Sequence, residues 1–490
     1  MHTDGLHDAK VPPSLPPWNL EFRSSKRFVI SVVSIAVFTD VFIYGMIVPI
    51  LPVVLQTRVI VPDDELQQWM SILLAAFGGA LFVGSPIFGY FADRSTSRQG
   101  PFIVGLLALG GSTVMFWVAS TLTALVIARA LQGLSAAVVW TVGMALVVDT
   151  VGKDQVGAAM GYVSMAMTVG TVFGPFIGGI MLSRLGYHAV FVMAIALVVL
   201  DILLRLVMIE QKTASKWIQP SVDETESLLD TAHRDGSVHY GAARSVPSDP
   251  SFENSTQLPE DGNGESASSG RTSSVPVMVR LICSRRVLVA LGATVVEAMM
   301  YSSFDTVLPL YVMRTFKWGP MLIGFCFLPL FAPSFSSPQV GAAVDRCGPR
   351  LIAFLGFSLG CPVFLLLHLI TENTTHDQIL LYVFLFIAGV ATTMQMVALM
   401  TEVDHFVEGQ EKAHPGIFGK QGAMAQAYGL FNVAWSGGQV LGPLIAGILM
   451  DVGGWSTMTC AFSIMSGATA VVIALTDRTI LQALGLVGNT

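Results

Sequence analysis

Charged residues are scarce in this chain. Asp, Glu, Lys and Arg make up 12% of its 490 residues, whereas a soluble globular domain carries about 25%. Hydrophobic residues account for 53%, and uncharged apolar stretches of about 20 residues recur along the sequence, each long enough to cross a bilayer core as a helix. This composition excludes a soluble protein and indicates an integral membrane protein with many spans.

Signatures of enzymes and ATP-driven pumps are also missing. No nucleophile–base arrangement, zinc-ligand spacing or phosphate-binding Gly-Lys loop stands out, which argues against an enzyme, a metal site and an ATPase. The five cysteines show no metal-ligand spacing, and we interpret them as small core residues. The net charge of −7 is concentrated in one loop and argues against binding of nucleic acid. No cleavable signal peptide is expected, because the polar start lacks a short apolar run.

The apolar stretches form two groups of six, at 28–209 and 287–476. We therefore expect an all-α membrane protein with twelve transmembrane helices in two pseudo-symmetric six-helix bundles. Residues 210–286 are rich in Ser, Asp, Glu, Gly and Pro, with few apolar residues to form a core, and predict a disordered linker. The N-terminal segment 1–27 is also expected to be disordered, and 477–490 forms the C-terminal tail.

Basic residues indicate the orientation of the spans, because they are enriched on the cytosolic side. One set of flanks carries Arg23, Lys26, Arg27, Arg94, Arg98, Lys153, Lys212, Lys216, Arg280, Arg285, Arg286, Arg346, Arg350, Lys412, Lys420 and Arg478. The opposite flanks carry only Arg58, Arg184, Arg314 and Lys317. We expect both termini and the linker to be cytosolic, and the plasma membrane is favoured over a vacuolar or vesicular one.

Four ionisable residues are predicted to lie at membrane depth: Asp40, Arg129, Glu297 and Asp305. A charge at the centre of a transmembrane helix costs about 2.5–3.5 kcal/mol on insertion scales, so each requires an explanation. We interpret the carboxylates as proton or cation sites facing a central cavity, because a desolvated carboxyl group takes up a proton more readily than one in water. The alternative is a set of static pairs, with Arg129 or with backbone groups, that only join helices.

Asp201 and Arg205 are different, because they lie four residues apart near the cytosolic end of the sixth span. This spacing places the two side chains next to each other on a helix. The arginine can also extend toward the headgroups. We expect a structural ion pair rather than a transport site.

Two predicted helices combine a small-residue face with a proline. Gly170, Gly174 and Gly178 recur at helical spacing around Pro175, so a neighbouring helix can approach the backbone while the proline bends the helix. The pair Gly442-Pro443 repeats this pattern in the second group. Bent helices at corresponding positions predict a duplicated transporter that rocks about a central path.

A short charged loop also occurs in both groups. Gly89-x-x-x-Asp93-Arg94 follows the second span, and Gly341-x-x-x-Asp345-Arg346 follows the eighth. Together with Arg98 and Asp149, the first copy could form a charge cluster that latches one conformation of a two-state transporter. The alternative is a tight turn that only carries cytosolic basic residues.

Polar and aromatic residues on three spans could line a binding cavity. We expect this of Tyr162 in the fifth span, Thr392 and Gln395 in the tenth, and Asn432 and Trp435 in the eleventh. Ordinary helix packing is the alternative for each of them. The sequence does not separate the two interpretations.

These motifs resemble the major facilitator superfamily over the whole chain except the N-terminal tail and the linker. Gly89–Arg98 resembles the family's loop between spans 2 and 3, and Arg129–Gly133 resembles its span 4 motif, which the family links to proton coupling. Gly170–Gly179 is similar to the span 5 motif of the drug:proton antiporters. The resemblance implies a twelve-span exporter that uses the proton gradient and no cofactor.

Within that family, Phe38-Thr-Asp40 and Asp305-Thr-Val-Leu-Pro309 resemble the vesicular amine transporter branch. There the acidic residues of these two motifs handle cations and protons. The branch has a lysine in span 2, where this chain has Phe77, and acidic residues in spans 10 and 11, where it has Thr392 and Asn432. The chain is therefore more similar to fungal efflux proteins of the branch.

The sequence thus predicts a proton-driven antiporter that exports small amphipathic or cationic organic molecules, such as drugs or secondary metabolites. The expected partners are that small-molecule substrate and the lipid bilayer, and we expect a monomer. The alternatives are a facilitator or proton symporter for uptake of a small solute, and a membrane sensor that transports nothing and recruits a partner through its linker.

Overall fold

A computed structural model describes the chain over residues 17–94, 99–151, 156–214, 217, 284–413 and 424–483. All regular secondary structure in these ranges is helical. The chain divides into two units, one of residues 1–18 and 212–274 and the other of residues 19–211 and 275–490. The second unit contains every candidate membrane span of the described residues. Most of the predicted N-terminal tail and linker lies outside the described residues.

Six spans come from the first half of this second unit. They are α2 (Lys26–Ile47), α4 (Leu66–Arg94), α5 (Gln99–Val118), α6 (Leu122–Val138) continued by η2 (Val139–Gly143) and α7 (Met144–Val151), α8 (Val156–Leu185) and α9 (Tyr187–Val207). Short helices in this part of the chain are α1 (Leu20–Arg23), α3 (Leu51–Val54), η1 (Leu55–Val59) and α10 (Gln211–Ala214).

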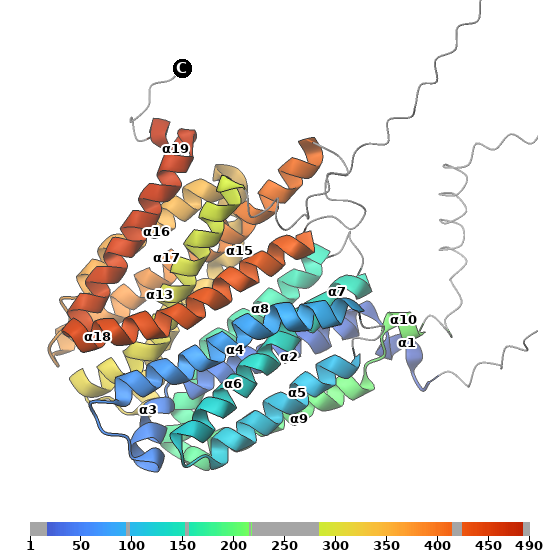
Figure 1. Cartoon of the computed structure of the whole chain (residues 1–490), viewed down its shortest axis with the longest axis horizontal. Helices are drawn as coiled ribbons and strands as arrows, with labels where there is room; N and C mark the ends of the chain where they lie inside the picture. The colour runs from blue at the N-terminus through green and yellow to red at the C-terminus, as the bar shows by residue number, and fades with distance from the viewer. Residues whose placement is uncertain are drawn as a thin grey trace, which may run out of the picture. The chain divides into compact units, whose positions relative to one another are not determined.

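The second half supplies the remaining spans. They are α13 (Arg285–Thr315), α14 (Pro320–Phe331) continued by η4 (Ala332–Ser336) and α15 (Ser337–Cys347), α16 (Pro349–Leu367), α17 (Thr375–Ala413) and α18 (Met424–Thr476), followed by the short α19 (Arg478–Ala483). Eleven described segments are long and apolar enough to cross a membrane. The last of them turns at Gly453 and Gly454, which are not helical, so it crosses twice. With this break counted, each half supplies six spans, as predicted, and Figure 1 shows how the helices are arranged.

Local sequence explains where several helices begin. Ser25 caps α2, because its hydroxyl accepts a hydrogen bond of 3.3 Å from the Phe28 amide. Proline opens α14 and α16, a position where no backbone donor is lost. Gly186 and Gly348 precede α9 and α16 with φ of +85° and +86°, a conformation that favours glycine.

Glycine faces bring the two proline-containing helices α8 and α18 close to their neighbours. A Cβ atom on Gly174 of α8 would lie 2.8 Å from the carbonyl oxygen of Phe42 on α2, and one on Gly170 would lie 3.0 Å from that of Phe38. In the second bundle, a Cβ atom on Gly438 of α18 would lie 2.5 Å from the carbonyl oxygen of Val295 on α13. The fifth span thus packs on the first, and the eleventh on the seventh.

The same two helices also contact the other bundle. A Cβ atom on Gly324 of α14 would lie 2.6 Å from the carbonyl oxygen of Pro175 on α8, and one on Gly78 of α4 would lie 2.9 Å from that of Gln439 on α18. Both contacts are related by the internal duplication. We refer to the end of the bundles where α2, α8 and α13 begin as the basic end.

The two bundles part toward the basic end. Phe176 of α8 packs against Phe325 of α14, with ring centroids 4.8 Å apart. Met165 and Tyr162 lie eleven and fourteen residues earlier on the same helix, which places them on the face that Phe176 occupies. Both are 64% exposed. The face of α8 that contacts the second bundle at one end is therefore open at the basic end.

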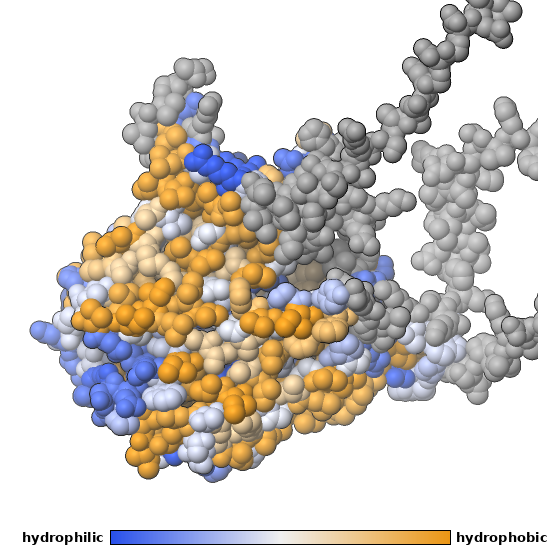
Figure 2. All heavy atoms as spheres, viewed as in Figure 1, coloured by the Kyte–Doolittle hydropathy of each residue, from blue (hydrophilic) through white to orange (hydrophobic). Residues whose placement is uncertain are grey.

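The outer surface of the bundles is apolar. Figure 2 shows hydrophobic side chains along the helices, with hydrophilic residues gathered toward their ends. Large side chains such as Leu203, Ile448 and Ile464 are more than half exposed. An apolar exterior of this extent suits lipid rather than water.

Replacing Gly174 with leucine should destabilise the protein, because the side chain would overlap the backbone of α2. Overpacking of this kind costs about 1–3 kcal/mol. Gly161→Leu on the same helix is the matched control, since a Cβ atom there meets nothing within 4 Å. Thermal unfolding in detergent should show a lower midpoint for Gly174→Leu only. Equal midpoints would contradict the close α2–α8 packing.

Candidate functional site

Asp305 is a buried carboxylate that connects the two bundles. It lies on α13 in the second bundle, is 2% exposed, and accepts a hydrogen bond of 3.0 Å at Oδ2 from the hydroxyl of Tyr44. Tyr44 belongs to α2 in the first bundle. The bond therefore crosses the interface between the bundles, from a half-buried hydroxyl to a buried carboxylate.

Arg129 of α6 lies on the other side of the same tyrosine. Its guanidinium carbon is 5.4 Å from the centroid of the Tyr44 ring and 5.6 Å from that of Phe77. The side chain is fully buried and donates a hydrogen bond of 3.2 Å to Gln132. Its Nε and Nη2 atoms have no hydrogen-bond partner among the described residues. Tyr44 thus offers its ring to a cation and its hydroxyl to a carboxylate.

Asp40 lies one helical turn from Tyr44 on α2 and has a different partner. It is 4% exposed and accepts a hydrogen bond of 3.3 Å from the indole Nε1 of Trp140. Trp140 belongs to η2, a π-helical turn between α6 and α7. Such turns change the direction in which side chains leave a helix and are frequent at functional sites. Asp40 and Tyr44 therefore share one face of α2, while Asp40 and Asp305 have separate hydrogen-bond partners.

Glu297, Tyr301 and Asp305 follow one another at intervals of four residues and so share one face of α13. Glu297 is 1% exposed, and its Oε2 has no hydrogen-bond partner in the described part of the chain. The ring of Tyr301 is centred 5.2 Å from that of Phe331 and 5.7 Å from that of Trp435. This face combines two buried carboxyl groups with an aromatic platform.

The two tyrosines escaped the sequence analysis, although a signal for them exists. An acidic residue followed four positions later by tyrosine occurs at Asp40–Tyr44 and again at Glu297–Tyr301, which correspond in the duplication. Trp140 carries no such signal, because its approach to α2 depends on the π-helical turn.

The predicted ion pair between Asp201 and Arg205 is wrong. Arg205 instead pairs with Glu210, at 3.8 Å from Nη2 to Oε1. Its guanidinium carbon also lies 4.5 Å from the centroid of the Phe102 ring. Glu210 follows the end of α9, so the arginine extends along the helix toward the basic end rather than back toward Asp201.

The predicted latch residues are only partly described. The described part of the chain leaves out the side chains of Asp93 and Arg94, in the last turn of α4, and the whole of Arg98. A Cβ atom on Gly89 would meet nothing within 4 Å. Asp149 is exposed near the end of α7. In the second copy of the loop, Asp345 and Arg346 are exposed at the end of α15. The latch remains a prediction.

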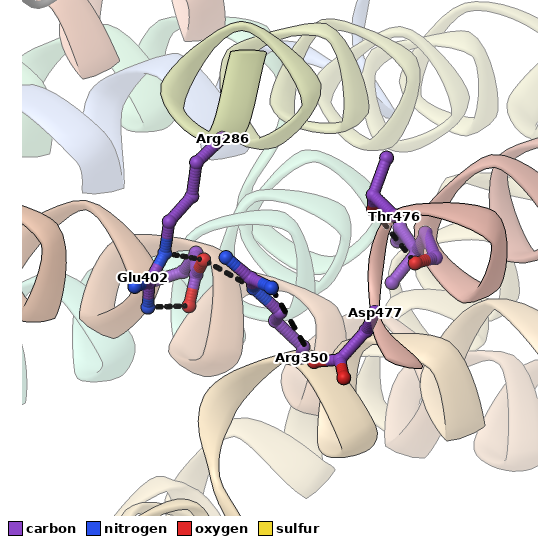
Figure 3. A network of polar contacts seen from close by, with 6 residues as sticks. Arg286, Arg350, Glu402, Thr476 and Asp477 are labelled. Carbon is purple, nitrogen blue, oxygen red and sulfur yellow. Dashed lines mark hydrogen bonds and ion pairs between the residues drawn. The ribbon is translucent and has the colours of Figure 1, made fainter. Parts of the chain in front are cut away.

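A charge network that the sequence analysis missed lies at the basic end of the second bundle (Figure 3). Glu402 of α17 is 5% exposed and accepts two hydrogen bonds from Arg286 of α13, of 2.5 and 3.0 Å. It also accepts one of 2.7 Å from Arg350 of α16, and Arg350 reaches Asp477 at 3.4 Å. The network joins three spans to the segment that follows α18.

Two predicted lining residues lie near the aromatic platform and one on the open face of α8. Trp435 contacts Tyr301, and Asn432 is half-buried one turn earlier on α18. Tyr162 occupies the exposed basic half of α8. Whether these three residues line a transport path remains a prediction.

The two residues predicted on α17 are placed differently. Thr392 donates a hydrogen bond of 3.1 Å to the carbonyl oxygen of Gly389 in its own helix. Gln395 is fully buried, and a Cβ atom on Gly356 of α16 would lie 3.0 Å from its Cγ atom. Gln395 therefore packs within the second bundle, apart from the Tyr301 platform. Among the described residues, no three His, Cys, Asp or Glu side chains are arranged to hold a metal ion.

Comparisons with known proteins agree with this architecture. The family model described as Major Facilitator Superfamily matches residues 33–414 and 290–481. An uncharacterized MFS-type transporter, C18.02, of Schizosaccharomyces pombe is 33% identical over 93% of this chain and 97% of its own length. The MFS-type transporter ppzB of Metarhizium rileyi is 30% identical over 94% and 97%.

More distant matches cover a part of the sequence or the fold alone. The quinolone resistance protein NorA of Staphylococcus aureus is 29% identical over 35% of this chain and 42% of its own length. The crystal structure of the nucleoside transporter NupG superposes with a TM-score of 0.62 over 91% of this chain and 98% of NupG, at 12% identity. This last similarity concerns the fold alone.

Replacing Glu402 with glutamine should destabilise the second bundle, because it removes the negative charge that Arg286 and Arg350 share and replaces one acceptor oxygen with an NH2 donor. Hydrogen bonds to charged groups contribute about 1.5–3 kcal/mol, and partial exposure of both arginines places the loss at the lower end. Glu408→Gln on the same helix is the control, since its pair with Lys412 is exposed and contributes about 0.3–0.5 kcal/mol. Thermal unfolding should separate the two variants. If both unfold at the wild-type temperature, the network does not stabilise the bundle.

Proposed function

We propose that this chain works as a proton-driven antiporter. It belongs to the Major Facilitator Superfamily and is a multi-pass membrane transporter. The proposed cargo is a small amphipathic or cationic organic compound, such as a drug or a secondary metabolite. The observation that carries the proposal is the buried Asp305 carboxyl group, which is hydrogen-bonded to the other bundle through Tyr44 beside the buried Arg129.

A carboxyl group in this position would couple proton and cargo through competition for one site. When Asp305 is ionised, it attracts a cationic or hydrogen-bond-donating substrate, and when it is protonated that attraction is lost. Binding at Asp305 would also weaken the contact between the bundles, because a proton or a cargo molecule on the carboxylate competes with the Tyr44 hydroxyl. A ligand shifts a conformational equilibrium only by its difference in affinity for the two states, and Asp305 would provide that difference.

The cost of buried charge would prevent futile cycling. An unpaired carboxylate sealed between two closed bundles is strongly unfavourable. The carrier would therefore change conformation with Asp305 bound to a proton or to a cargo, and not with an empty ionised site. Asp40 would provide a second proton position on α2, one turn from Tyr44, where it accepts a hydrogen bond from Trp140.

We also propose that both termini and the linker face the cytosol and that the protein lies in the plasma membrane. The asymmetry of basic residues supports this orientation. The exposed face around Tyr162 would then open toward the cytosol, where cargo for export is collected. Protons outside the cell would be taken up from the other side.

Similarity to NorA supports export of drug-like compounds, because the name of that protein refers to quinolone resistance. The aromatic platform of Tyr301, Phe331 and Trp435 is suited to planar or cationic ligands, which bind to the faces of aromatic rings.

The test begins with a panel of labelled organic cations and neutral amphipathic compounds, whose accumulation is compared in expressing and deleted cells with and without an uncoupler. Any transported compound is then followed in proteoliposomes with a pH gradient. Asp305→Asn and Asp40→Asn should lose gradient-driven transport to background, because neither can ionise. Asp451→Asn, at an exposed position of α18, should retain it.

Other outcomes would favour other functions. Counterflow without a pH gradient, undiminished by the uncoupler, would indicate a facilitator, and inward accumulation with protons would indicate a symporter. Absence of flux, together with loss of a cellular response on deletion of residues 215–275, would indicate a sensor. Full coupling in both Asp variants would refute the assigned proton sites.

A further inference from the structure

Two adjoining cavities of about 370 Å³ each lie along the basic end of α13. Both are lined by Arg285 and Val289, so they meet at this edge of the helix. The first contains the arginines of the charge network together with apolar side chains. The second runs between α13 and the last part of α18, and apart from Arg285 and Thr469 its lining is apolar or glycine.

The first cavity has an excess of positive charge. Arg285, Arg286 and Arg350 line it together with Glu402, and Arg350 also reaches Asp477, so three arginines face two carboxylates. Glu402 is engaged by Arg286 and Arg350, whereas Arg285 is exposed and makes no ion pair within the described part of the chain. Arg285 is also the first residue of α13, whose N-cap Ser284 makes no side-chain capping bond. The amide groups of this helix end add to the attraction for an anion.

The second cavity continues toward membrane depth. Gly292 lies seven residues from Arg285 along α13, or about 10 Å at the helical rise, and a Cβ atom there would meet nothing within 4 Å. Leu288 on α13 and Val472 on α18 border the cavity and are 50% and 47% exposed. The groove is therefore open sideways on the apolar exterior rather than toward the interface between the bundles.

The first bundle lacks both features. The correspondence of Asp40 with Glu297 and of Pro52 with Pro309 places Phe28 at the position of Arg285 and Ile35 at that of Gly292. An arginine at the start of the helix and a glycine seven residues later thus occur together only in the second bundle, as Arg285 and Gly292. Their combination is a property of this site and not of the duplicated fold.

We propose that this groove binds an anionic phospholipid, with the phosphate at Arg285 and an acyl chain beside Gly292. A lipid fits both halves of the site: the headgroup lies where basic residues of a membrane protein attract anionic lipids, and the chain replaces water in an apolar groove. A soluble anion would use the first cavity alone. The proposal is independent of the direction of transport.

The test is native mass spectrometry of the full chain, purified in detergent and titrated with phosphatidylserine or phosphatidylcholine of equal chain length. Arg285→Gln should lower the affinity for phosphatidylserine about five-fold, the equivalent of roughly 1 kcal/mol for one basic residue. Gly292→Ile, which introduces the side chain that the first bundle carries, should weaken binding of phosphatidylserine by blocking the chain.

Two control variants make the result specific. Arg27→Gln removes an exposed basic residue near the start of α2, and Gly111→Ile adds a side chain at another open glycine; both should bind phosphatidylserine as the wild type does. The proposal is overturned if Arg27→Gln and Arg285→Gln lose affinity equally, since the charge effect would then be unspecific. It is also overturned if Gly292→Ile binds normally while inorganic phosphate displaces the lipid, which would indicate a soluble-anion site.

Discussion

The hydrogen bond between Tyr44 and Asp305 is the interaction on which the rest of this account depends. It joins α2 to α13 across the interface of two bundles and ends on a buried carboxylate. Breaking it without replacement would leave a buried polar group unsatisfied, which is costly. In the proposed mechanism, a proton or a cargo molecule that takes over the carboxylate would act on the contact between the bundles as well as on the site itself.

The packing around this bond differs within and between the bundles. Gly170 and Gly174 let α8 pack closely on α2, and Gly438 lets α18 pack closely on α13. Each of these two helices is therefore held within its own bundle. Contacts between bundles lie at Gly324 and Gly78, away from the open basic end. A rocking motion would change these second contacts while it preserves the first.

Periodicity and duplication were enough to predict the helices but not their polar partners. Hydropathy alone located the spans, and the repeated Gly-Pro pattern identified two helices with close-packed glycine faces, because both are local properties of the chain. The partner of Asp305 is 261 residues away and that of Arg286 is 116 residues away, and no single-sequence pattern reports such distances. The Asp201–Arg205 prediction failed because helical spacing permits a pair, whereas the arginine could also reach Glu210 beyond the helix end.

The most direct test of the central claim is the distance between the bundles at the basic end as a function of pH. Spin labels at position 26 of α2 and at the exposed Cys347 of α15, with the other cysteines replaced by serine, would report it by electron–electron resonance. Acidification should change the distance distribution of the wild type, and Asp305→Asn should show the acidic distribution at every pH. A variant that still responds to pH as the wild type does would contradict it.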